Sequence, residues 1–282
     1  MLAKTYECFT VEIEDKVAHI RLSRGDALNT MTKAFWNELP EIVRTIDRDV
    51  LARVIVISAD GKHFSAGMDL ANFGDGSVTA KAADKWVAAE QFRSNIRQIQ
   101  SSFNALEEAR MPVLFACQGG VIGGAIDMIS AGDIRWCTAD AWFCIQETNI
   151  AMTADVGTFP RLQRYIPEGW VKEMAYTGRR LGAAQAKDIG LVNEVYDTHE
   201  AMMDAVMATA REIASKDPLA VTGCKALINY GRDHSTADTL DYIGVWNAGM
   251  IPPGHMQEAF KAKMEKREPE YPDLAPLRDT PM

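Results

Sequence analysis

The chain has 282 residues, which is enough for one large domain or for one domain with an appendage. Its composition, 47% hydrophobic and 24% charged, is that of a globular protein, and no apolar run reaches the ~20 residues of a membrane-spanning helix. The net charge of −9, without a long basic block, argues against nucleic acid as the main partner. Five cysteines without a CxxC pair and five scattered histidines predict reduced core thiols and no metal site.

Neither end of the chain resembles a targeting signal. The first 16 residues, MLAKTYECFTVEIEDK, are acidic and strand-like, unlike a signal or transit peptide. The last four, DTPM, differ from the Ser-Lys-Leu peroxisomal signal. We therefore expect a cytoplasmic protein.

The first third of the chain predicts a hairpin, a helix, a strand and a long helix. Apolar and polar residues alternate over 9–13 and 17–22, which is typical of paired strands. A helix follows, with Thr30 or Thr32 as its cap, and the apolar run 53–59 predicts a central strand covered on both faces. Residues 79–110 carry an apolar stripe at helical spacing, with the composition of a core-facing helix.

The middle of the chain predicts a strand, a glycine-rich turn and a helix. The apolar run 112–117 ends in glycines at positions 119, 120, 123 and 124, and residues 125–131 read as the opening of a helix. This layout aims backbone N–H groups at an anionic or developing negative oxygen.

Helical patterns dominate the rest. We expect helices over 169–177 and 181–189, a strand over 191–196, and then helices over 201–216, 218–232, 236–248 and 257–266. Strand–helix alternation followed by a helical tail predicts an α/β core at 1–198 and a helical segment at 199–282.

Three carboxylates lie in or after the glycine-rich stretch. Asp127 falls in the first turn of the predicted helix, Glu147 follows 20 residues later, and Asp155 eight residues after that. Their small and apolar neighbours make ionisation costly if the groups are buried. Together they indicate acid–base chemistry. The alternatives are a helix-start carboxylate for Asp127, a helix N-cap for Asp155 and an ordinary paired acid for Glu147.

Four segments carry a resemblance to the crotonase (enoyl-CoA hydratase/isomerase) superfamily over about residues 9–271: RGDALN at 24–29, HFSAGMDL at 63–70, GGVIGGAIDMISAGDIRWCTADAWF at 119–143 and TGRRLGAAQAKDIGLVNEVY at 177–196. The resemblance implies an α/β fold of the ClpP/crotonase-like kind, a spiral of repeated ββα units. It also implies a helical C-terminal segment that builds trimers, often paired into hexamers. The implied ligand is an acyl-CoA thioester, so CoA belongs to the substrate and no separate cofactor is expected.

The resemblance also implies site residues. By motif position, the oxyanion hole would be formed by the backbone N–H groups of Ala66 and Gly124. The implied CoA-binding positions are Arg24, Ala27, Leu28, Ser65, Ala66, Gly67, Met68, Asp69, Leu70, Gly124 and Lys266. Lys266 matches a lysine that reaches the nucleotide of a neighbouring subunit, although Lys263 stands where the family usually has an aromatic residue.

The acids point to one branch of the superfamily. Hydratases carry glutamates at the positions of Asp127 and Glu147 and a glycine at the position of Asp155. Asp127, Glu147 and Asp155, with Ala-Asp-Val-Gly-Thr at 154–158, resemble the Δ3,5-Δ2,4-dienoyl-CoA isomerase branch. That reaction removes a proton from C2 and adds one at C6, roughly 5 Å apart, so two acids on opposite sides of a pocket suit it.

We assign Glu147 to C2 as the base, Asp155 to C6 as the acid, and Asp127 to tuning Glu147; the two shuttle roles are also compatible in reverse order. An enoyl-CoA hydratase, a mono-unsaturated enoyl-CoA isomerase, and a non-catalytic acyl-CoA- or RNA-binding scaffold are the alternatives. A hydratase has no need of Asp155, a mono-unsaturated isomerase can work with one acid, and the acidic net charge disfavours RNA.

Overall fold

The computed structural model describes residues 4–69, 71 and 84–278. Within them, the larger sheet has six strands in the order β1-β2-β3-β4-β6-β9. The predicted hairpin is confirmed, because β1 and β2 pair antiparallel, and the later strands add in parallel. The bounds are β1 Phe9–Glu14, β2 Val17–Leu22, β3 Val54–Ala59, β4 Val113–Cys117, β6 Ile134–Thr138 and β9 Glu194–Tyr196.

A second, three-stranded sheet forms beside the glycine-rich turn. It consists of β5 Gly120–Ile122, β7 Trp142–Cys144 and β8 Leu181–Gly182 in the order β5-β7-β8. The chain passes from β4 to β5 through Gly119, whose φ of 54° favours glycine. A Cβ at this position would overlap the Lys62 carbonyl oxygen, so the step between the two sheets requires glycine.

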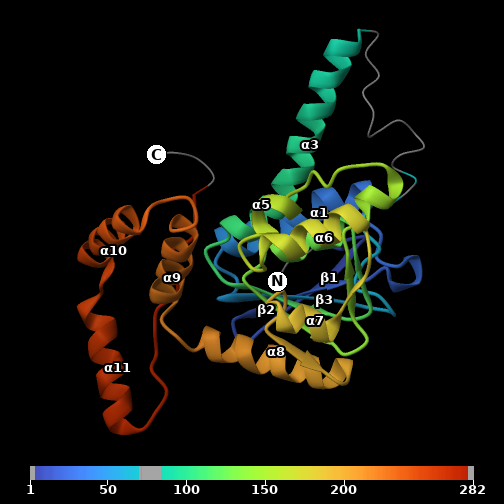
Figure 1. Ribbon diagram of the computed structural model, residues 1–282. Helices are drawn as coiled ribbons and strands as arrows, with labels where there is room; N and C mark the ends of the chain where they lie inside the picture. Colours follow the sequence, from blue (N-terminus) through green and yellow to red (C-terminus); the bar gives the residue numbers. More distant parts are fainter. Residues whose placement is uncertain (1–3, 70, 72–83, 279–282) are drawn as a thin grey trace.

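Helices cover both faces of the larger sheet (Figure 1). Helix α8 packs on one face, against the side chains of Val54 and Val56, while Ile55 and Ile57 face the main core on the other side. The complete burial of β3 on both faces confirms the predicted central strand. The helices of this body are α1 Lys33–Arg48, α3 Lys85–Glu108, α4 Gly124–Ser130, α5 Thr158–Leu162, α6 Glu168–Thr177, α7 Ala183–Asp188 and α8 His199–Ala214.

Local details refine the predicted elements. Thr32, and not Thr30, caps α1 by accepting a hydrogen bond from the Phe35 N–H. The predicted helix over 181–189 was wrong at its start, because residues 181 and 182 extend as β8 and pair with β7. Of the predicted helix over 79–110, residues 79–83 lie outside the described residues, and Asp84 caps the part that follows.

The last helices are α9 Pro218–Tyr230, α10 Thr236–Met250 and α11 Pro253–Glu265; α9 lies nearest the body, and α10 and α11 lie farther out (Figure 1). Lys225 of α9 anchors them, because its ammonium lies 2.9 Å from the Asp133 carboxylate and donates to two backbone carbonyls. After α11 the chain returns, and Arg53 binds the Tyr271 carbonyl and the Asp273 carboxylate. Helix α8 packs on the sheet, so the projecting segment begins after it; the division at residue 198 stays a prediction.

No helix in the described residues is both long enough and apolar enough to cross a lipid bilayer.

Candidate active site

A cavity of about 630 Å³ opens where the glycine-rich turn meets the loops that follow β2, β3 and β7. Its wall is largely apolar, with side chains such as Trp36, Met68, Ile122 and Val156. All three acids singled out in the sequence line it, although they come from three different elements. The tertiary structure therefore brings Asp127, Glu147 and Asp155 into one cavity.

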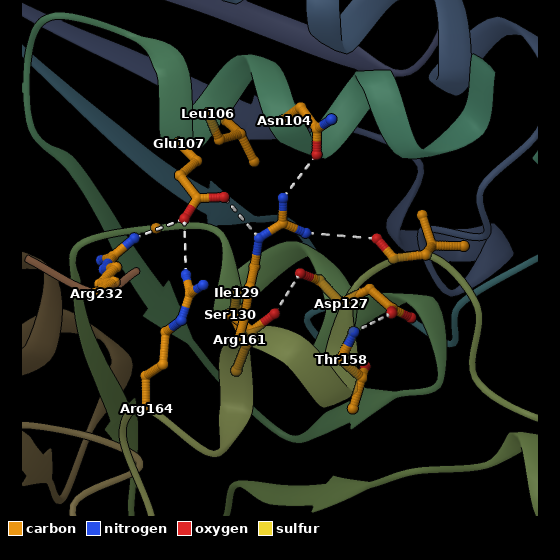
Figure 2. Close-up of polar contacts among 12 residues, drawn as sticks. Asn104, Leu106, Glu107, Asp127, Ile129, Ser130, Thr158, Arg161, Arg164 and Arg232 are labelled. Carbon is orange, nitrogen blue, oxygen red and sulfur yellow. Dashed lines mark hydrogen bonds and ion pairs between the residues drawn. The ribbon is translucent and has the colours of Figure 1, made fainter. Parts of the chain in front are cut away.

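Asp127 lies in the first turn of α4 and is 1% exposed. Its Oδ1 accepts a hydrogen bond of 2.7 Å from the backbone N–H of Thr158, the first residue of α5 (Figure 2). Burial, and then the charge of Glu147, raise the pKa of Asp127 to about 7, against the opposing effect of the Thr158 hydrogen bond. The Asp127 carboxylate therefore binds the N-terminus of α5, in addition to lying in the first turn of α4.

Glu147 begins the short 3₁₀ helix η2, Glu147–Ile150, directly after β7. Its Oε2 is buried and has no hydrogen-bond partner among the described residues. Burial raises the pKa of this carboxyl group, and the nearby Asp155 charge adds to the shift, while backbone N–H groups of Glu147 and Gln146 oppose it. An unpartnered carboxylate oxygen in an apolar cavity is chemically suited to accept a proton.

Asp155 lies in the loop before α5 and is half-buried. The Gln100 side chain donates a 2.6 Å hydrogen bond to its backbone carbonyl, and burial raises the pKa of its carboxyl group. The cap position of α5 belongs to Gly157, and the first N–H of that helix binds Asp127 instead. The alternative interpretation of Asp155 as a helix N-cap is therefore excluded.

The raised pKa of Asp127 predicts a pH-dependent stability. Between the ordinary pKa of 3.8 and about 7, the folded protein holds a proton that the unfolded chain has lost, so the free energy of unfolding falls as pH rises through this window. Asp127→Asn removes the ionisation and keeps an acceptor for Thr158. We expect the stability of this variant relative to wild type to increase by on the order of 4 kcal/mol from pH 4 to pH 8, since one pKa unit corresponds to about 1.4 kcal/mol. Urea unfolding at both pH values measures the gain; a pH-independent difference would contradict the prediction.

The predicted oxyanion hole is partly corrected. Gly124 is the first residue of α4, where backbone N–H groups have no intrahelical acceptor, and it lines the cavity. The Ala66 N–H, in contrast, donates a 2.9 Å hydrogen bond to the Leu28 carbonyl oxygen and so is not available to a thioester in this arrangement. On the same wall, the Met68 backbone nitrogen lies 3.9 Å from the Cβ position of Gly124.

The expected CoA-binding residues divide into two groups. Leu28, Ala66, Met68 and Gly124 line the cavity, and Leu28 is 47% exposed at its edge. Ser65 is fully buried and its hydroxyl donates to the Asn29 carbonyl, so this side chain holds the loop together.

Among the described residues, Arg24, Ala27, Gly67, Asp69 and Lys266 do not line the cavity. Arg24 donates to the Thr30 carbonyl, and Asp69 accepts from the Thr30 hydroxyl. Ala27 belongs to the exposed turn η1, Gly25–Ala27, and Gly67 adopts a φ of 80°. Leu70 lies outside the described residues, and Lys266 is the residue directly after α11. Their contact with CoA stays a prediction.

Several cavity residues were not predicted. Trp36 comes directly after the buried Phe35 in α1 and lines the cavity. Its ring packs on Phe103, with the two ring centroids 5.2 Å apart. Trp142 also lines the cavity, and the Arg180 guanidinium lies over its indole, 3.8 Å from the ring centroid. No local sequence pattern marked Arg180 as a cavity residue. Its contact with Trp142 depends on the pairing of β7 with β8, which are far apart in the sequence.

The two-sheet α/β fold and the acid-lined cavity at a helix N-terminus define the class of protein. The sequence profile of the enoyl-CoA hydratase/isomerase family matches residues 12–274. The chain belongs to this family, and its fold is the crotonase fold.

Relatives and solved structures agree with this assignment. The mitochondrial Δ(3,5)-Δ(2,4)-dienoyl-CoA isomerase of Homo sapiens is 38% identical over 266 residues, which cover 94% of this chain and 81% of that one. The peroxisomal Δ(3,5)-Δ(2,4)-dienoyl-CoA isomerase of Arabidopsis thaliana is 36% identical, with coverage of 96% and 98%. The crystal structure of an enoyl-CoA hydratase from Bacillus anthracis superposes with a TM-score of 0.84 at 29% identity, covering 94% of this chain and 99% of that one.

Proposed function

We propose that the protein is a Δ3,5-Δ2,4-dienoyl-CoA isomerase. The observation that carries the proposal is the position of Asp155 in the same apolar cavity as Asp127 and Glu147. A hydratase uses two acids to activate one water. A proton shift between two distant carbons needs a carboxyl group at each carbon, and Asp155 provides the second one. The printed names of the relatives at 36–38% identity support the same choice.

In the proposed reaction Glu147 removes a proton from C2 of the 3,5-dienoyl thioester. The electron pair moves into a dienolate, whose oxygen accepts a hydrogen bond from the Gly124 N–H at the start of α4. Asp155 then donates a proton to C6, which leaves the 2,4-diene. C2 and C6 are roughly 5 Å apart, so two carboxyl groups serve the two carbons without a large movement of either. Proton exchange with solvent returns both acids to their starting states.

The raised pKa values fit these roles. Burial raises the pKa of the Asp155 carboxyl group, which is the direction that the proposed acid needs, while Glu147, whose Oε2 has no hydrogen-bond partner among the described residues, is the proposed base. Asp127 is held by the Thr158 N–H, and its partial charge near pH 7 adjusts the basicity of Glu147.

We also propose that the protein acts as a homotrimer or as a pair of trimers. None of the side chains of α10 is buried in the single chain, although the helix carries large apolar residues such as Leu240 and Val245. Further large apolar side chains are exposed on its neighbours: Ile228, Met256, Phe260 and Met264. Apolar surface of this extent is typical of a subunit interface.

A paired assay of the purified protein tests the proposed activity. With 3,5-octadienoyl-CoA we expect a rise in ultraviolet absorbance from the conjugated 2,4-dienoyl thioester. With crotonyl-CoA we expect little loss of the enoyl absorbance. Hydration of crotonyl-CoA without diene isomerisation would instead establish the protein as an enoyl-CoA hydratase, in which Asp127 and Glu147 hold the water.

A further inference from the structure

Behind the cavity, the Glu107 carboxylate of α3 joins three arginines (Figure 2). Its Oε2 lies 2.9 Å from Nε of Arg161, and its Oε1 accepts from Arg232 at 2.5 Å and from Arg164 at 3.4 Å. Arg164 and Arg232 are on the outer side of this cluster, and Arg164 also binds Asp233. Arg161 is 7% exposed and is the member that reaches toward the acids.

Arg161 fixes the loop that precedes its own helix. Its Nη2 donates to the Asn104 side chain at 2.6 Å, and its Nη1 lies 3.5 Å from the Val156 carbonyl oxygen. Gly157 has a φ of 131°, and a Cβ at this position would overlap Nη1 of Arg161. The guanidinium group therefore lies where a side chain at residue 157 would be, and it packs directly on the backbone of the loop.

One face of α3 provides the other fixed points. Gln100, Asn104 and Glu107 follow at the i, i+4, i+7 spacing that aligns side chains on a helix. Gln100 binds the Asp155 carbonyl, while Asn104 and Glu107 bind Arg161. Residues 155 and 156 are thus attached to α3, the first directly through Gln100 and the second through Arg161.

The loop controls two of the three acids. It carries Asp155, and its Thr158 N–H is the hydrogen-bond donor to Asp127. Arg161 does not line the cavity, so it has no contact with a substrate there. Any effect of Arg161 on the reaction must pass through the position of these carboxylates.

We propose that Arg161, held by Glu107 and Asn104, is a positioning residue that sets the geometry of Asp155 and Asp127. The inference rests on the proposed isomerase function. A planar guanidinium makes several hydrogen bonds in fixed directions, which an ammonium group cannot reproduce. A positive charge at residue 161 is therefore not enough to hold Asp155 and Asp127 in position. The directed hydrogen bonds of the guanidinium group are also needed.

Arg161→Lys tests the proposal because it keeps the charge and loses the directed contacts. Misplacement of a reacting group by about 1 Å can cost about 100-fold in rate, so we expect kcat for 3,5-octadienoyl-CoA to fall about 10- to 100-fold with KM within about twofold. The pH profile of kcat should shift as well, because the environments of Asp155 and Asp127 change. Arg164→Met is the matched control: it removes another arginine from Glu107 without a contact to the loop, and its kcat and pH profile should match wild type.

Amide hydrogen exchange provides a measurement that needs no substrate. We expect Arg161→Lys to speed exchange at the Thr158 N–H, and Arg164→Met to leave it at the wild-type rate. Should Arg161→Lys not fold, Asn104→Ala removes one fixed point of Arg161 and should cause smaller changes in the same direction. Wild-type kcat, pH profile and exchange in the Arg161 variant, or equal losses in both arginine variants, would overturn the proposal. A wild-type enzyme inactive on dienes would refute the proposed function, while the exchange result would still decide the positioning role.

Discussion

Asp155→Asn is expected to lower kcat for the conversion of 3,5-octadienoyl-CoA into the conjugated product about 100- to 10,000-fold, the range for loss of a general acid. The amide cannot donate a proton to C6, whereas the Gln100 hydrogen bond to the backbone of residue 155 is unaffected. Because Glu147 remains, the variant should still exchange the C2 protons of the bound substrate with deuterated solvent. Absorbance and mass spectrometry of the recovered thioester measure the two outcomes together.

Two comparisons make this result specific to Asp155. Asp140→Asn changes an exposed acid close to β7 that accepts a hydrogen bond from the Thr138 hydroxyl, and it should behave as wild type in both measurements. Binding of the product thioester by the Asp155 variant should remain near the wild-type level, because the side chain acts on a proton and leaves the CoA part of the ligand untouched. Full diene turnover by Asp155→Asn would remove the main support for the isomerase assignment.

Glu147→Gln is expected to lower kcat by a similar factor but to stop the reaction one step earlier. Without the base no dienolate forms, so exchange of the C2 protons should stop together with product formation. The charge of Glu147 also raises the pKa of Asp127, and its removal should therefore lower the Asp127 pKa from about 7 toward its ordinary range. Solvent exchange at C2 and carboxyl titration by NMR measure these effects.

The two variants together assign the shuttle roles. If Glu147→Gln kept C2 exchange and Asp155→Asn lost it, the base at C2 would be Asp155 and the order of proton transfer would be reversed. An unchanged Asp127 pKa in Glu147→Gln would show that the charge of Glu147 does not contribute to the shift. The Asp155 variant is the internal control for the titration, since its charge has a smaller effect on Asp127 than that of Glu147.

Asp127 is expected to lower the stability of the fold, although it supports the proposed reaction by tuning Glu147. Burial and the charges of Glu147 and Asp155 raise the pKa of Asp127 to about 7, so this acid lowers the free energy of unfolding as pH rises from about 4 to about 7. A site that gains stability when a functional acid is neutralised is common where activity depends on costly burial. The loop whose Thr158 N–H binds Asp127 is also contacted by Arg161, through the Val156 carbonyl oxygen.

The sequence by itself determined the elements whose side-chain pattern is local. The alternation of residues 9–22 predicted the hairpin, the apolar run of β3 its double burial, and the glycines at 119–124 a turn into a helix. The acid spacing selected Asp127, Glu147 and Asp155, and all three lie in one cavity.

Only the tertiary structure decided the contacts between distant segments. Residues 181 and 182 extend because β7 offers them a partner, and the Ala66 N–H is occupied because the Leu28 carbonyl lies 2.9 Å away across a long loop. Asp127 accepts a hydrogen bond from the Thr158 N–H, 31 residues later, and Arg161 of α5 connects the Asp155 loop to Asn104 of α3. Such contacts follow from the packing of the whole chain, since hydrogen bonds to buried groups form wherever folding brings a partner, and local residue patterns carry no record of that partner.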